Sequence, residues 1–187
     1  MNFNFSFTGK GLKKMKSKFW VAAALLGFFA TSCTAMKMTG EEKYGKEVPV
    51  ISQSFASKQV SSGEAWRVYI HASDADGDLD RINCSIDQVG VFPAYPSADI
   101  KIGQDQQKNL SGYLYLSTSG LDRSMDINLT LSIRDKAGHF SAPVTFHLDI
   151  IQPSGKQKEI RQEDPPRGTF EDKNLGPIMI ILHSEIG

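Results

Sequence analysis

Four acidic side chains are the residues best suited to bind a metal ion in this sequence. Asp74, Asp76 and Asp78 alternate along the stretch SDADGD, and Asp135 opens the stretch DKAGH. Calcium prefers oxygen ligands and takes about six to eight of them at roughly 2.3–2.6 Å. The spacing is not that of an EF-hand, because Ser85 stands at the twelfth place, where that loop needs Glu. Plain turn chemistry is the alternative, because Asp bonds its local backbone and Gly accepts positive φ.

Cys33 is the second residue with distinctive chemistry, and it follows an apolar segment. Five lysines precede the apolar run from Phe19 to Ala30, and no acidic residue occurs before Glu41. A positive flank before a short apolar core is typical of an export signal. A helix of this length rises about 18 Å, whereas a membrane span must cross roughly 30 Å. We therefore expect an export signal and not a transmembrane anchor.

The end of this segment, Ala-Thr-Ser-Cys, resembles the lipobox of bacterial lipoproteins. In that family the cysteine thiol receives a diacylglyceryl group, and cleavage leaves the cysteine as the new N-terminus. The resemblance implies a signal peptide over residues 1–32, whose true start we place at Met15, and a membrane anchor on Cys33. Thr34 stands where Asp often marks retention in the inner membrane, so the outer membrane of the cell envelope is favoured. An ordinary secretory signal, with Cys33 a bystander, is the alternative.

Removal of residues 1–32 from the 187 leaves 155, enough for one domain. The whole chain has 21 basic and 21 acidic residues, and the removed segment holds five lysines and no acid. The mature chain therefore has 16 basic and 21 acidic residues, a net charge of −5. This sign gives no reason to expect a nucleic-acid partner. Cys84 is the only other cysteine, so we expect a small buried hydrophobic residue and no disulfide.

The elements that position these residues are predicted to be strands. Over residues 48–151 apolar and polar residues alternate with period two, and turn-forming stretches separate the runs. About seven strands over roughly 100 residues predict an all-β fold, a single antiparallel Greek-key β-sandwich. The side chains expected in its core are Trp66, Val68, Ile70, Ala72, Ile82, Cys84, Ile86, Leu114, Leu116, Ile127, Leu129, Leu131, Ile133, Val144, Phe146, Leu148 and Ile150.

Two stretches resemble cadherin repeats. ASDADGDLDRINCSI is similar to the passage between their second and third strands, and GLDRSMDINLTLSIRDKAGHFSAPVTFHLDI to their end. The resemblance implies an immunoglobulin-like or cadherin-like sandwich, and calcium ligands at Asp74, Asp76 and Asp122. Ser124 departs from the family's calcium-binding Glu, and IIQPSGK replaces its acidic linker.

In this topology the second-to-third and sixth-to-seventh turns lie at the same end of the sandwich. We therefore expect Asp74, Asp76 and Asp78 to lie near Asp135 and to form a calcium site. The other acidic residues expected nearby are Asp80 and Glu47, the latter at the end of a lipidated tether over residues 33–47.

No catalytic motif accompanies these residues in the sequence. The histidines, His71, His139, His147 and His183, form no HExxH, and neither a phosphate-binding loop nor G-x-S-x-G is present. We therefore predict that the protein is not an enzyme but a non-catalytic envelope lipoprotein acting as a protein-binding or assembly module. One alternative is a calcium-stabilised adhesion or carbohydrate-contacting surface domain. An enzyme or enzyme accessory subunit is the third possibility.

After residue 151 the composition changes. Residues 152–176 are polar and broken by Pro165 and Pro166, which predicts a linker. Residues 177–187 then include the apolar run Ile178–Leu182, which predicts a C-terminal strand. An exposed apolar strand is an aggregation hazard, so some surface must cover it. Either the strand docks on its own sandwich, or it adds to the sheet of an envelope protein partner; a disordered end or an altered reading frame is the remaining reading.

Overall fold

The computed structural model describes residues 38–88, 95–121, 124–152 and 160–182. The predictions for the signal peptide, Cys33 and Asp122 therefore fall outside the described residues. The strands are β1 (Val50–Ala56), β2 (Gln59–Ser61), β3 (Ala65–Ser73), β4 (Leu79–Gln88), β5 (Ala98–Lys101), β6 (Asn109–Ser117), β7 (Met125–Asp135), β8 (Val144–Ile151) and β9 (Asn174–Pro177). Within these described ranges two short helices accompany the strands, α2 (Gly40–Tyr44) and the 3-10 helix η1 (Gln104–Gln106).

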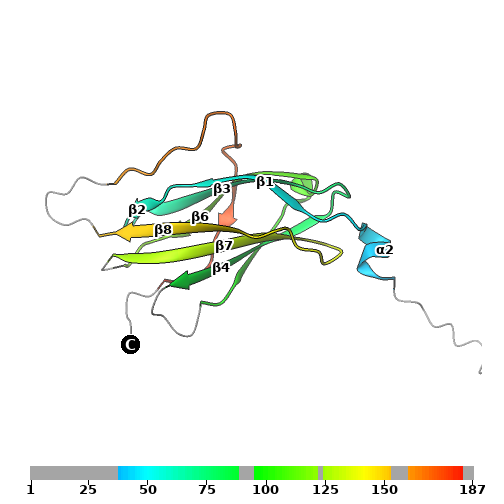
Figure 1. Cartoon of the computed structure of the whole chain (residues 1–187), viewed down its shortest axis with the longest axis horizontal. Coiled ribbons are helices and arrows are strands. Elements are labelled where there is room, and N and C mark those ends of the chain that lie inside the picture. The colour runs from blue at the N-terminus through cyan, green and yellow to red at the C-terminus, as the bar shows by residue number, and fades with distance from the viewer. Residues whose placement is uncertain (1–37, 89–94, 122–123, 153–159, 183–187) are drawn as a thin grey trace, which may run out of the picture. The chain divides into compact units, whose positions relative to one another are not determined.

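The strands form two sheets that face each other (Figure 1). One sheet has the order β1-β3-β6-β9, and the other has the order β2-β8-β7-β4-β5. After β1 the chain crosses between the sheets, because β1 pairs antiparallel with β3 whereas β2 pairs parallel with β8. The indole of Trp66 donates a hydrogen bond of 2.8 Å to the carbonyl of Ser57 at this crossing. The predicted all-β Greek-key sandwich is confirmed.

Alternate residues of the strands fill the space between the sheets. The inward side chains of β3, β4, β6 and β7 are buried, as the period-two pattern predicts, among them Trp66, Ile86 and Leu131. Val144 and Phe146 are the exceptions, because they are only partly buried and pack against the border of the core. Cys84 is fully buried and unpaired, and burial raises the pKa of its thiol to about 12.

Tyr69 shows that one outer face of the sandwich is covered. It points away from the core between neighbours that face inward, yet it is buried. Its ring lies near those of Phe55, Tyr113 and Phe170, at centroid distances of 6.5, 5.6 and 5.7 Å. Phe170 belongs to residues 160–182, which we call the C-terminal arm, so the arm returns across this sheet.

The arm ends by closing the sandwich. Strand β9 pairs parallel with β6 and forms one edge of its sheet. After it, Ile178, Ile180 and Leu182 turn into the core, whereas Met179 and Ile181 are 77% and 78% exposed. The structure thus places the strand at Asn174–Pro177, over the last three residues of the expected linker and the first of the expected strand. The apolar run continues from it without regular strand pairing.

Among the described residues, no helix has the length and apolar character needed to cross a membrane. Helix α2 has only five residues, and it lies beyond one end of the sheets, next to the start of β1 (Figure 1).

Candidate cation site

Three carboxylates meet at the end of the sandwich that bears α2. Asp74 follows the last residue of β3, Asp78 precedes the first residue of β4, and Asp135 ends β7. Strand register brings the last two together, because Leu79 lies opposite Asp135 in the β4–β7 ladder. Each of the three offers an oxygen within 4.8 Å of the others, and their exposed fractions are 3%, 6% and 1%. We call Asp74, Asp78 and Asp135 the carboxylate trio.

Local backbone groups satisfy only part of the trio. Asp74 Oδ1 accepts hydrogen bonds from the N–H groups of Asp76 and Gly77 at 2.8 and 3.0 Å. Asp78 Oδ2 accepts one from the N–H of Lys136 at 3.2 Å. The second oxygens, Asp74 Oδ2 and Asp78 Oδ1, are buried and have no hydrogen-bond partner. Both oxygens of Asp135 have partners, because Oδ1 accepts from the N–H groups of Gly138 and His139 and Oδ2 contacts the His139 ring. Local backbone bonds therefore account for one oxygen each of Asp74 and Asp78 and leave the other without a partner.

No lysine or arginine of the described chain forms an ion pair with the trio. The nearest candidate by sequence, Lys136, directs its ammonium group to the side-chain oxygen of Gln107 at 2.6 Å. Burial, followed by repulsion from Asp135 and Asp74, raises the pKa of Asp78 above its usual value. His139 Nδ1 lies 2.8 Å from Asp135 Oδ2, but no described basic side chain pairs with Asp74 or Asp78. Buried carboxylates without a counter-charge are strongly unfavourable. A bound cation or a proton would relieve this charge.

The donors of the trio suit a hard cation. All are carboxylate oxygens, which Ca²⁺ and Mg²⁺ prefer and which softer metals do not select. Two oxygens on opposite sides of one Ca²⁺ lie about 4.6–5.2 Å apart, whereas those of Mg²⁺ lie about 4.0–4.2 Å apart. The 4.8 Å limit on the trio is compatible with both, and it leaves room for the longer calcium bonds.

Asp76, which the sequence predicts as a calcium ligand, and Asp80, which it places nearby, do not join the trio. Asp76 is exposed and not part of the trio; its Oδ2 accepts a hydrogen bond of 2.8 Å from the N–H of Glu47. Asp80 forms ion pairs with Arg81 and Arg134 at 3.2 and 3.5 Å. Residues two apart would share one side of a regular strand, but the chain turns at Asp76, where the N–H groups of Asp76 and Gly77 bond Asp74 Oδ1. Asp80 lies at a register shift between Leu79 and Arg81 in the β4–β7 ladder.

His139 also lies at this end of the molecule, although the sequence did not indicate it as a residue of the site. Its Nδ1 lies 2.8 Å from Asp135 Oδ2, and its Nε2 lies 3.4 Å from Glu41 Oε1. These carboxylates, Asp135 first, raise the pKa of His139. The four-residue spacing of Asp135 and His139 across the turn DKAGH was the available signal.

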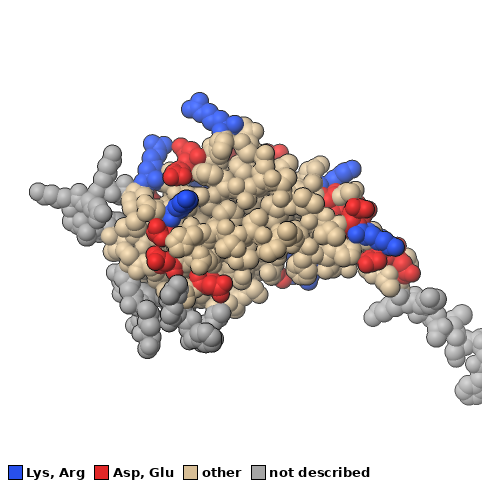
Figure 2. Space-filling model, in the orientation of Figure 1, with Lys and Arg blue, Asp and Glu red and all other residues tan. Residues whose placement is uncertain are grey.

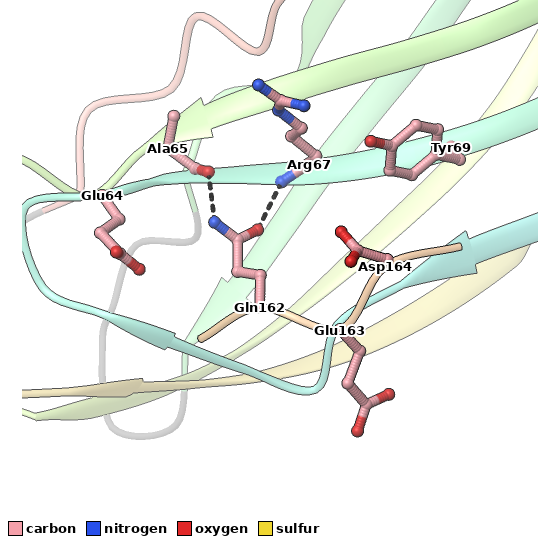
Figure 3. Close-up of a pocket in the computed structure, with 7 residues that line it drawn as sticks. All are labelled: Glu64, Ala65, Arg67, Tyr69, Gln162, Glu163 and Asp164. Atoms are coloured by element: carbon pink, nitrogen blue, oxygen red, sulfur yellow. Dashed lines mark hydrogen bonds between the residues drawn. The ribbon is translucent and has the colours of Figure 1, made fainter. Parts of the chain in front are cut away.

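A separate groove of about 360 Å³ lies along β3, at the end of the strand that β1 does not cover (Figure 3). There the side-chain amide of Gln162 takes the place of a neighbouring strand. It accepts a hydrogen bond from the N–H of Arg67 at 3.2 Å and donates one to the carbonyl of Ala65 at 2.8 Å (Figure 3). The arm is therefore bound along this edge, and the exposed backbone of β3 is satisfied within the chain.

Comparisons with known proteins address the fold. No protein-family model and no curated protein matches the chain. Among solved structures it is similar to the fibronectin(III)-like modules of Clostridium thermocellum CbhA, at 14% identity and a TM-score of 0.33, over 57% of this chain and 47% of that one, about half its length. It is also similar to the CARDB domain of a Pyrococcus furiosus protein in complex with di-metal ions, at 10% identity and a TM-score of 0.28, over 57% and 88% of the two chains.

The strand order identifies the fold independently of these similarities. The first two strands split between the sheets, and β4, β7 and β8 adjoin one another opposite β3 and β6. The domain is an immunoglobulin-like β-sandwich. In this immunoglobulin-like domain the trio lies at the end where the chain enters, because Asp76 beside it binds the backbone of Glu47 just before β1.

Proposed function

We propose that this protein is a non-catalytic binding module of the bacterial cell envelope, anchored by a lipid on Cys33 and stabilised by calcium at the carboxylate trio. The observation that carries the calcium site is the pair of buried, unpartnered oxygens, Asp74 Oδ2 and Asp78 Oδ1. Since both belong to carboxylates that share one site, a single divalent cation would satisfy both. Asp135 is the third protein ligand, and water or backbone carbonyls complete the shell.

The proposed role as a binding module rests on the kind of scaffold. An immunoglobulin-like sandwich hosts many functions, so the fold alone does not name one. The exposed Met179 and Ile181 support contact with an envelope protein partner, because they lie beside the buried residues of the same apolar run. The lipid anchor rests on the lipobox resemblance around Cys33, and Thr34 favours the outer membrane.

The calcium site is tested by thermal unfolding of the purified protein in chelator and in millimolar calcium. A cation that binds only the native state stabilises it by about 2.7 kcal/mol at a hundredfold excess over its Kd. We expect a clear rise in Tm with calcium, and little change in the variant Asp78→Asn. Asp87→Asn, the same change at an exposed position on β4, should behave as the parent does. Equal Tm values in chelator and calcium would refute the site.

The partner is tested by photo-crosslinking in intact cells. A crosslinking residue placed at Met179 or Ile181 should capture a defined envelope protein, whereas one at the exposed Thr145 of β8 should not. Capture of the same products from all three positions would argue against a specific contact through the tail.

A further inference from the structure

Residues 39–47, which lie between the proposed lipid anchor and β1, contact the loops that carry the trio. We call these residues the docked segment. One contact is made by the N–H of Glu47, which donates a hydrogen bond to Asp76 Oδ2 at 2.8 Å. The other contact is made by Glu41, whose Oε1 lies 3.4 Å from His139 Nε2. A segment expected as a free tether is therefore bound to the domain at two places.

Two glycines let the segment approach this closely. A Cβ atom on Gly40 would lie 2.5 Å from the carbonyl oxygen of Ala137, in the loop after β7. Gly45 has φ of +111°, which side chains rarely adopt, and a Cβ there would overlap the carboxylate of Asp76. Both loops of the cation site thus contact the segment with little space to spare.

The segment is ordered by this docking more than by its own helix. Helix α2 has a capping box, in which Thr39 and Glu42 bond each other's backbone at 3.3 and 2.8 Å. A helix of five residues is nevertheless far too short to persist alone in water. Charges of both signs lie side by side on this end of the molecule (Figure 2), and Lys136 of the second loop reaches to 5.9 Å from the ring of Tyr44.

The two residues that hold the docked segment, Asp76 and His139, each hydrogen-bond directly to a member of the trio. The N–H of Asp76 donates to Asp74, and His139 bonds Asp135 through both its N–H and its ring. We infer that the carboxylate trio, when it holds a cation, keeps the docked segment in place, and that loss of the cation releases it. Without the cation the like charges of the trio repel and separate the two loops that the segment bridges. The coupling is reciprocal, so docking also raises the affinity for the cation.

This inference rests on the proposed function and adds a consequence for the anchored protein. Between Cys33 and Met38 lie the residues 34–37, which span at most about 14 Å when extended. If the docked segment is released, the link runs over residues 34–49 and spans up to about 55 Å. Cation binding would therefore determine how far the sandwich stands from the membrane.

Trypsin provides the test, because Lys43 and Lys46 lie within the docked segment. The protein is purified from membranes in detergent, and cleavage after these lysines is followed by mass spectrometry, normalised to an unstructured reference peptide. Calcium binding is measured on the same sample by calorimetry. We expect cleavage to be at least about tenfold slower in millimolar calcium than in chelator, because proteolysis follows the population of the open form.

Three variants sharpen the test. Asp76→Ala removes the acceptor for Glu47 but none of the trio, so calcium should still bind while cleavage becomes fast in both conditions. Asp78→Asn removes one of the three charges and so lowers the repulsion, and its segment should stay more resistant than that of the parent in chelator and respond little to calcium. Asp87→Ala should match the parent. Calcium binding without any change in cleavage overturns the inference and leaves the proposed site standing; absence of calcium binding overturns both.

Discussion

Asp74 and Asp135 come from loops far apart in the sequence, yet their carboxylate oxygens lie within 4.8 Å of each other, and Asp78 completes the group. Both loops leave the same end of the sandwich, one from β3 and one from β7. A cluster of like charges in this position lowers the stability of the native state unless something neutralises it. Its effect on stability should therefore depend on the cation present.

The variant Asp78→Asn should change stability in opposite directions with and without calcium. In chelator it removes a buried charge, and the new amide can donate to Asp74 Oδ2, so the free energy of unfolding should rise by about 1 kcal/mol. In saturating calcium it should fall below the parent by about 2 kcal/mol, because a ligand is lost. Urea unfolding in both conditions measures this, with Asp87→Asn as control. A variant less stable than the parent in both conditions would indicate that Asp78 is an ordinary structural carboxylate.

Two isoleucines of the C-terminal apolar run should differ in how much their replacement lowers the free energy of unfolding. Ile178 is 3% exposed and Ile181 is 78% exposed, although they belong to one apolar run. Ile178→Ala should lower the free energy of unfolding by about 2–4 kcal/mol, through lost burial and a cavity. Ile181→Ala should change it by less than about 0.5 kcal/mol. Equal small effects in urea unfolding would show that the tail does not close the core.

Gln162 should protect the uncovered edge of β3. In Gln162→Ala the N–H of Arg67 loses its acceptor, so its amide hydrogen should exchange with solvent faster than in the parent. The free energy of unfolding should fall by about 0.5–1.5 kcal/mol. Arg161→Ala, beside it on the arm with a side chain 89% exposed, is the matched control. Unchanged exchange at Arg67 would mean that the arm does not bind this edge in solution.

Cys84 should be unreactive toward thiol reagents in the native protein. Burial raises the pKa of its thiol from 9.0 to about 12, so almost no thiolate is present at pH 8, and the sulfur is inaccessible. Because the folded pKa is the higher one, this thiol stabilises the native state below pH 9.0, and that contribution declines as the pH rises toward about 12. Labelling at pH 8 should begin only as urea unfolds the chain. Rapid labelling without urea would contradict the burial of Cys84.

The same titration in urea counts the thiols that are free. If Cys33 carries a diacylglyceryl group, its sulfur is a thioether, and unfolded protein from membranes should react at one thiol per chain. Two reactive thiols per chain would show that Cys33 is not acylated.

The sequence by itself determined the sandwich and its inward side chains. Alternation along β3, β4 and β7 is a local pattern, since successive side chains of any strand point to opposite faces. It also indicated which carboxylates share an end of the fold, because Greek-key order places the loop of Asp74 and Asp78 beside that of Asp135. Calcium at this site stays a prediction.

Only the tertiary structure decided which oxygens are left without partners and what covers the surface. Asp76 alternates with Asp74 and Asp78 in sequence, but it points outward and binds the backbone of Glu47. The segment expected as a linker instead packs Phe170 on Tyr69 and places β9 beside β6. These contacts join parts of the chain that are distant in sequence, so their free energy depends on the assembled surface. A local pattern of residue types therefore cannot predict these contacts.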